Sequence, residues 1–105
     1  MIVVVGRVRT DAAKRADLVR IARAVVTASR NDEGCISYRF YEDAEIKNNF
    51  VFIEEWESDD ALQKHFATPH IGEFMRAVPA TLVAPPDVSF HTIEHSRNLA
   101  DMSGR

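Results

Sequence analysis

The first apolar run of the chain predicts a β-strand. Residues 2–9, "IVVVGRVR", are rich in β-branched side chains, and both faces of the run are apolar at its start. We therefore expect a central strand that is covered on both sides. Gly6 leaves a gap on its face, where a ligand or a neighbouring side chain can come close.

Apolar positions three and four residues apart then predict a helix. The stripe comprises Leu18, Ile21, Ala22, Val25 and Ala28. Thr10 and Asp11 are candidate N-caps for this helix. Residues 31–34, "NDEG", end it, because Gly34 can adopt a positive φ there.

Two alternating segments predict the next strands. In residues 35–42, "CISYRFYE", the side chains of Ile36, Tyr38 and Phe40 share one face, which indicates a half-buried strand. A polar loop separates this segment from residues 50–56, "FVFIEEW", which form the next strand with aromatic side chains on one face.

The second half of the chain predicts a broken helix and a last strand. Ser58 caps a helix whose first turn holds two aspartates, where the helix dipole favours anions. Thr68 and Pro69 start a second helical segment, since proline suits the first helical position. Residues 87–95, "DVSFHTIEH", alternate as a strand, and a loose tail follows.

The order of these elements is strand, helix, strand, strand, broken helix, strand. With right-handed crossovers this order predicts a ferredoxin-like βαββαβ sandwich of the α+β class. Residues 1–95 would form this domain, and residues 96–105 its C-terminal tail. The helices would cover one face of the sheet. Because the other face also carries apolar side chains, we expect a second copy of the chain to cover it in a symmetric homodimer.

Composition excludes several classes of function. Of the 105 residues, 46% are apolar and 28% are charged, an ordinary balance for a soluble domain. The net charge is −3 and the basic residues lie mainly on the first predicted helix, so we expect no nucleic-acid partner. No stretch approaches the roughly 18 apolar residues of a membrane span. The single cysteine, Cys35, rules out an internal disulfide and fits a cytoplasmic location.

Two histidines bracket residues 65–70, "HFATPH". His65 shares a helix face with Leu62 and Phe66, so it should point toward the sheet. There it can be a catalytic acid–base group or a hydrogen-bonded core residue. His70 follows Pro69 and can simply be exposed. A zinc site is disfavoured, because no third ligand is evident near the two histidines.

Polar side chains of segment 48–56 are further candidates. Glu54 can be a buried base with a raised pKa, or it can pair with an arginine such as Arg7 or Arg39 or lie at the rim of the sheet. Asn48 and Asn49 can be turn formers, or amides that hold a carbonyl or enolate oxygen. The aromatic side chains fit a core, and together they can also line an apolar pocket. No glycine-rich nucleotide fingerprint is present.

Two segments carry a resemblance to a known family: "RNDEGCISYRFYED" and "NNFVFIEEWESDDALQKHFATPHIGEFM". Together they resemble the antibiotic biosynthesis monooxygenase (ABM) family, from residue 2 to about residue 94. Its members typically show an E-G-C/x-x-x-Y turn and strand, an E-x-W-x-S-x-x-A-L-x-x-H helix entry, and often a T-P-H segment. The matching positions here are Glu33, Gly34, Cys35 and Tyr38; Glu54, Trp56, Ser58, Ala61, Leu62 and His65; and Thr68, Pro69 and His70.

The resemblance implies a dimeric ferredoxin-like α+β barrel and a cofactor-independent monooxygenase. Several members oxidise phenols, anthrones or quinols with molecular oxygen and use no flavin, haem or metal. A deprotonated, electron-rich aromatic can itself reduce oxygen, so the protein needs an apolar pocket, a base and a donor for the oxyanion. The candidate catalytic residues are His65, Asn49 and Trp56, with His65 as the proton acceptor. The candidate substrate-binding residues are Tyr38, Phe52, Phe66, His70, Phe74 and Met75.

Other functions of the same fold remain as alternative hypotheses. The resemblance extends to haem-degrading members, but their ligand histidine, near the position of Met75, is absent here. It also extends to the isomerase that processes autoinducer-2, which keeps a histidine where His65 lies and acts on a phosphorylated dione. A phosphate would require a basic anchor in the pocket. The third hypothesis is a non-catalytic dimer module that binds a small ligand, since a fold alone does not fix function.

Overall fold

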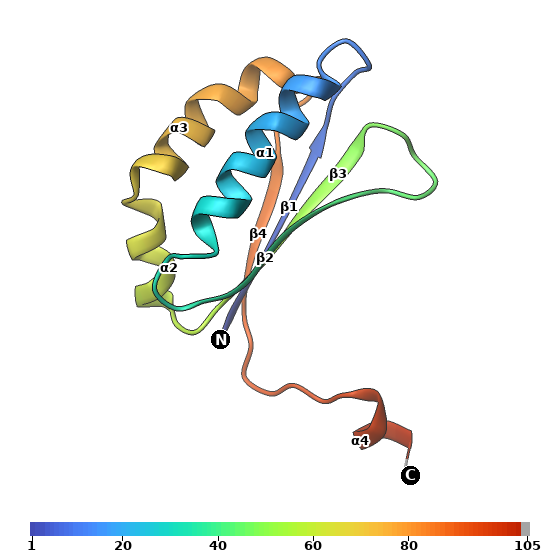
Figure 1. Ribbon diagram of the computed structural model, residues 1–105. Helices are drawn as coiled ribbons and strands as arrows, with labels where there is room; N and C mark the ends of the chain where they lie inside the picture. Colours follow the sequence, from blue (N-terminus) through green and yellow to red (C-terminus); the bar gives the residue numbers. More distant parts are fainter. Residues whose placement is uncertain (104–105) are drawn as a thin grey trace.

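The computed structural model describes residues 1–103 and has a four-stranded antiparallel sheet with helices packed on one face (Figure 1). The strands β1 (Ile2–Arg9), β2 (Cys35–Glu42), β3 (Asn49–Trp56) and β4 (Asp87–Thr92) lie in the order β2-β3-β1-β4. The helices α1 (Arg15–Ser29), α2 (Asp59–Phe66) and α3 (Pro69–Ala77) cover one face, and a 3-10 turn, Val78–Thr81, follows α3. This architecture confirms the predicted ferredoxin-like α+β fold with its broken second helix.

Strand β1 is central, as its sequence predicts. It pairs with β3 on one side and with β4 on the other. Its buried side chains Ile2, Val4 and Val8 face the helices, while Val3 and Val5 are half-buried on the opposite face. The hydrophobic core therefore lies between the sheet and α1–α3, and the chain itself covers only one face of this strand.

Strand β2 departs from the predicted alternation at its start. Cys35 pairs with Trp56 and Ser37 pairs with Glu55, so Ile36 is the extra residue of a β-bulge. The prediction that Ile36 faces the core is therefore wrong, and this side chain is 51% exposed. From Ser37 onward the pairing of β2 with β3 is regular, and Tyr38, opposite Glu54, is buried.

The first helix begins later than predicted. Thr10 and Asp11 are not its N-caps, because α1 starts at Arg15. Asp11 instead accepts a hydrogen bond from the backbone N–H of Lys14, at 3.0 Å. The Thr10 hydroxyl donates to the backbone carbonyl of Thr81, at 2.6 Å, and ties the end of β1 to the 3-10 turn.

The predicted signals around the broken helix are confirmed. The Ser58 hydroxyl accepts a hydrogen bond from the backbone N–H of Ala61 at 3.1 Å and caps α2. Pro69 lies in the first turn of α3. Gly34 adopts a φ of +80°, and a Cβ added there would lie 2.4 Å from the Cβ of Ala61. The turn between α1 and β2 therefore packs directly against α2 because position 34 has no side chain.

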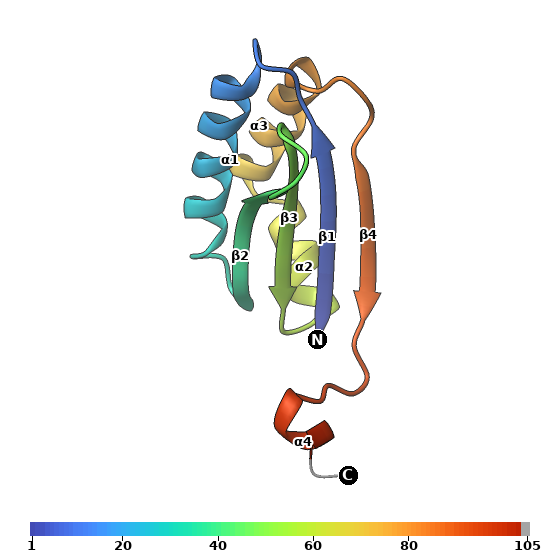
Figure 2. The same cartoon turned by 90° about the vertical axis from the view of Figure 1, so that its right-hand side faces the viewer.

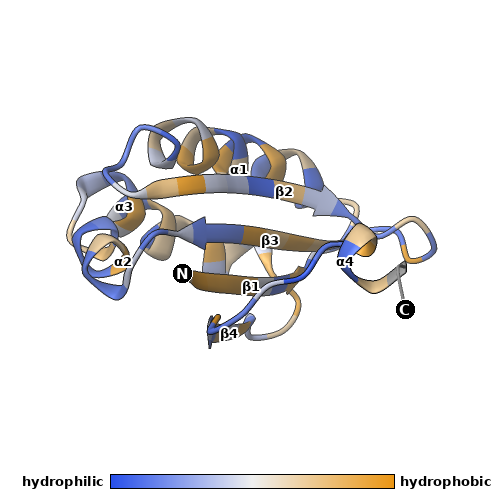
Figure 3. Cartoon of the chain, turned by 90° about the horizontal axis from the view of Figure 1, so that it is seen from below, coloured by the Kyte–Doolittle hydropathy of each residue, from blue (hydrophilic) through white to orange (hydrophobic). Residues whose placement is uncertain are grey.

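The face of the sheet opposite the helices is uncovered (Figure 2). It carries polar side chains and an apolar set of Val3, Val5, Tyr41, Val51 and Ile53. The sheet viewed from below in Figure 3 shows apolar stretches along β1 and β3. In the part of the chain that the structure describes, no helix is long and apolar enough to cross a membrane.

The segment after β4 leaves the sheet and ends in a short helix, α4 (Leu99–Ser103), away from the other helices (Figures 1 and 2). The sequence pattern predicts a loose tail here and does not predict this helix. The last two residues of the predicted tail, Gly104 and Arg105, lie outside the described residues.

Candidate active site

An apolar cavity of about 360 Å³ lies between the sheet and the α2–α3 side of the helical layer. Strands β1, β3 and β4, both halves of the broken helix and the 3-10 turn contribute to its walls. Among the described residues that line it, only three have polar side chains: Tyr38, Glu54 and His65. The lining side chains Phe66, Met75, Val88 and Phe90 are also partly exposed to solvent, which places the rim of the cavity there.

The cavity has one polar end. It extends along β1 from Val4 to Val8, a distance of about 13 Å for four residues of a strand. Val4 pairs across the sheet with Glu54, whereas Val8 pairs with Phe50. The polar groups therefore lie near Val4, and the end near Val8 is apolar.

His65 lies at the polar end and is 1% exposed. Its Nδ1 is 2.8 Å from the Oδ2 of Asp32, while its Nε2 is buried and has no hydrogen-bond partner among the described residues. A carboxylate accepts hydrogen bonds, so Nδ1 donates and Nε2 carries the free lone pair. Burial lowers the pKa of His65, against the opposing effect of Asp32. The arrangement therefore presents a neutral imidazole whose Nε2 can take up a proton.

Asp32 belongs to the turn after α1 and binds a second histidine. The Nε2 of His70 lies 2.8 Å from the same Oδ2 atom that His65 binds. Asp32 therefore ties the α1–β2 turn to both α2 and α3. The sequence pattern indicates only that Asp32 belongs to a turn that ends a helix. No local signal identifies its role, because its two partners lie 33 and 38 residues further along the chain.

These three residues could also hold a metal ion. One ligand atom each from Asp32, His65 and His70 lies within 4.8 Å of the others. The prediction that the two histidines lack a third ligand is therefore wrong. Asp32 Oδ2, His65 Nδ1 and His70 Nε2 are already joined by two 2.8 Å hydrogen bonds, and a metal bound to these atoms would have to replace both.

Glu54 is the second polar group of the cavity and is 8% exposed. Its Oε1 accepts a hydrogen bond from the indole N–H of Trp56, at 3.0 Å. Neither Arg7 nor Arg39 pairs with it, since their strand positions face the opposite side of the sheet. Burial raises the pKa of Glu54 to about 7, although the hydrogen bonds of Trp56 and Tyr38 lower it. Of the two interpretations of this residue, the structure favours the buried carboxyl with a raised pKa.

Tyr38 and Trp56 pack around His65. Tyr38 is 2% exposed, and its ring centroid lies 5.6 Å from that of His65. Burial and the nearby Glu54 carboxyl raise the pKa of Tyr38, so its hydroxyl remains a hydrogen-bond donor. The Trp56 ring is fully buried and lies 4.5 Å from the His65 ring. These two ring contacts therefore help to hold the imidazole in place.

The structure brings together six of the nine predicted site residues. The six that line the cavity are Tyr38, Phe52, His65, Phe66, Phe74 and Met75. Trp56 lies behind His65 and does not line the cavity, and His70 lies beside Asp32 and is partly exposed. Asn49 faces the uncovered side of the sheet, where it lines a separate hollow with Arg7 and Arg9.

Comparison with known protein families identifies the family of the chain. Residues 1–77 match the model of the family described as antibiotic biosynthesis monooxygenase. The chain belongs to this family. The match covers the strands β1–β3 and the broken helix, and so includes Asp32, Glu54 and His65.

Two relatives of this ABM-family chain, from Bacillus subtilis and Mycobacterium tuberculosis, carry the name "Putative monooxygenase". The Bacillus subtilis protein named "Putative monooxygenase YcnE" is 32% identical over 88 residues, 84% of this chain and 93% of that protein. The solved structure of Rv0793 from Mycobacterium tuberculosis has a TM-score of 0.86 and 27% identity, covering 92% of this chain and 98% of that one. SnoaB from Streptomyces nogalater, described as a cofactor-independent oxygenase, has a TM-score of 0.78 over 90% of this chain and 94% of its own. At 17% identity, SnoaB shows the shared fold alone.

Proposed function

We propose that this ABM-family chain is a cofactor-independent monooxygenase that oxidises a small, uncharged aromatic, quinol or anthrone-like substrate with molecular oxygen. The observation that carries the proposal is the His65 imidazole, buried at the polar end of an apolar cavity with Nε2 unpaired. The names of two relatives, both called "Putative monooxygenase", support this function, and a cofactor-independent oxygenase shares the fold.

The chemistry begins with proton removal. His65 Nε2 takes the acidic proton of the substrate, and the resulting anion is electron-rich enough to give one electron to oxygen. The imidazolium that forms is stabilised by Asp32 at Nδ1, as a carboxylate stabilises a catalytic histidine in other enzymes. The apolar walls exclude water, which keeps these electrostatic interactions strong. Asp32 and His70 act here as positioning residues for His65.

The cavity favours an uncharged aromatic substrate. Its volume of about 360 Å³ lies within the range of small-molecule sites, which is roughly 300–1,000 Å³. Aromatic and aliphatic side chains form most of its wall, and none of its described lining residues is Lys or Arg. A phosphorylated dione, the substrate of the related isomerase, would have no basic anchor there. This observation favours the oxidation of an aromatic over that alternative.

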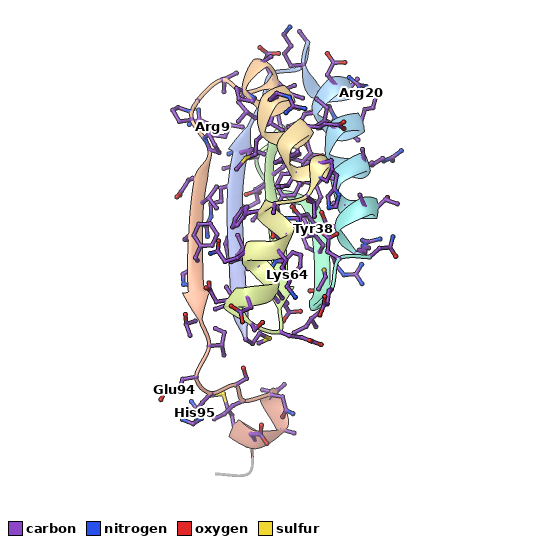
Figure 4. All side chains as sticks on the ribbon, turned by 90° about the vertical axis from the view of Figure 1, so that its left-hand side faces the viewer. Arg9, Arg20, Tyr38, Lys64, Glu94 and His95 are labelled. Atoms are coloured by element: carbon purple, nitrogen blue, oxygen red, sulfur yellow. The ribbon has the colours of Figure 1, made fainter. Side chains whose placement is uncertain are left out.

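Oxygen uptake with a panel of reduced naphthoquinols and anthrones, without added cofactor, tests the proposal. His65→Gln keeps a donor for Asp32 but removes the base, so we expect uptake to fall by about 10²–10⁴-fold. The matched control is His95→Ala, since His95 is exposed on the segment after β4 (Figure 4). Uptake that survives in His65→Gln would rule out His65 as the base. A wild-type protein that consumes no oxygen with any of these substrates would refute the proposed reaction.

We also propose that the protein is a homodimer through the uncovered face of the sheet. The apolar side chains Val51 and Ile53 on this face would otherwise contact water. Light scattering at micromolar concentration should give twice the 11.8 kDa mass of the chain. Ile53→Arg should shift the mass to that of the monomer, and a monomeric wild-type protein would contradict the proposal.

A further inference from the structure

Glu54 is a buried carboxyl group with no cationic partner among the described residues. A buried carboxylate without a paired charge is costly, and this cost favours the protonated acid. Trp56 holds Oε1, which fixes the orientation of the carboxyl group at the wall of the cavity. The same cavity wall contains His65, so two groups able to transfer protons meet at one end of it.

The titratable neighbours of Glu54 differ in their behaviour near neutral pH. Strand β2 presents Tyr38 and Cys35, and α2 presents His65. Burial raises the pKa of the Cys35 thiol to about 11 and also raises that of Tyr38, so both remain protonated. Burial lowers the pKa of His65, which is therefore neutral. On β1 the partner of Glu54 is the apolar Val4, which in turn pairs with the apolar Phe90 on β4.

Oxidation of a CH₂ group to a ketone by oxygen requires proton transfer in two stages. In the first stage a base removes one proton, the carbanion adds O₂ after electron transfer, and the returning proton gives the hydroperoxide R₂CH–O–OH. In the second stage the remaining C–H bond and the O–O bond break while C=O forms. The products are R₂C=O and water, so O₂ has accepted four electrons in all. One group must take the C–H proton while another gives a proton to the departing hydroxide.

We propose that Glu54 is the catalytic acid of the second stage and gives its carboxyl proton to the departing hydroxide, while His65 takes the C–H proton. This inference rests on the proposed function and assigns a second catalytic residue to the same cavity. Afterwards Glu54 is ionised and His65 is protonated, and transfer of one proton between them restores both. The substrate class that needs such a pair carries two hydrogens on the carbon to be oxidised, as an anthrone does.

The test compares Glu54→Gln with the matched control Glu57→Gln, an exposed glutamate in the link to α2. The glutamine amide oxygen can still accept the hydrogen bond of Trp56, but the amide cannot act as the acid. With an anthrone as substrate, we expect Glu54→Gln still to consume oxygen. The amount of ketone formed per molecule of oxygen consumed should fall at least about tenfold. Hydroperoxide or released hydrogen peroxide should replace the missing ketone. Glu57→Gln should match the wild type, and Glu54→Asp, which keeps an acid, should recover part of the ketone yield.

The outcomes separate this inference from the proposed function. Ketone formation by Glu54→Gln at the wild-type yield would overturn the role of Glu54 and leave oxygen uptake by the wild type intact. Loss of oxygen uptake itself in a folded Glu54→Gln would place Glu54 in the first stage and overturn the assigned role. An absence of uptake in the wild type would overturn both proposals together.

Discussion

The buried carboxyl of Glu54 should make the stability of the fold depend on pH. Its pKa is raised from an ordinary value of 4.5 to about 7 in the folded chain, so folding favours the protonated form. The contribution of Glu54 to stability is therefore largest below pH 4.5 and is lost as the pH rises through 7. Because one pKa unit is worth about 1.4 kcal/mol, the full loss is roughly 3–4 kcal/mol. About 2–3 kcal/mol of it develops between pH 5 and pH 8.5.

Glu54→Gln removes this dependence, because its amide does not titrate. We expect the free energy of unfolding of the variant, relative to the wild type, to rise by about 2–3 kcal/mol between pH 5 and pH 8.5. Urea titrations at several pH values measure it, and the two midpoints should move apart by roughly 1–2 M. Glu57→Gln, measured in parallel, should track the wild type. A difference between Glu54→Gln and the wild type that stays constant with pH would refute the argument that Glu54 is buried as an acid.

Two glycines give further predictions. Gly34→Ala should lower the free energy of unfolding by at least about 1–3 kcal/mol, because of its positive φ and the contact with Ala61. Gly72→Ala in α3 is the control and should not destabilise the fold. Equal melting temperatures for the two variants would contradict the close packing of Gly34 against Ala61. Gly6→Leu should fill the cavity and raise KM at least about tenfold. Gly6→Ala should leave KM unchanged, because its added Cβ meets only ordinary contacts at 3.8 Å. An unchanged KM in Gly6→Leu would place the substrate elsewhere.

The sequence predicted the architecture well because its signals are local. Alternation in residues 50–56 and the Ser58 and Pro69 signals each act within a few residues of where they occur. Gly34 was likewise predicted to adopt a positive φ. The bulge at Ile36 escaped prediction, since one extra residue reverses the faces without changing the pattern of residue types.

The candidate site was harder to predict, because its groups meet through tertiary contacts. Asp32 reaches His65 and His70 only after the broken helix has packed on the turn, and no spacing rule connects them. Glu54 had two interpretations, and only the position of the arginines on the opposite face distinguishes them. Asn49 could have been placed correctly, since the alternation that turns Glu54 toward the helices turns Asn49 away from them.

The unequal ends of the cavity have a consequence for selectivity. A rod-shaped aromatic lying along β1 would bring its ionisable end to Glu54 and His65, and its hydrocarbon end to the wall near Val8. Such a site fixes which carbon is oxygenated but demands little of substituents at the far end of the molecule. The protein should therefore be strict in regiochemistry and permissive in substrate scope.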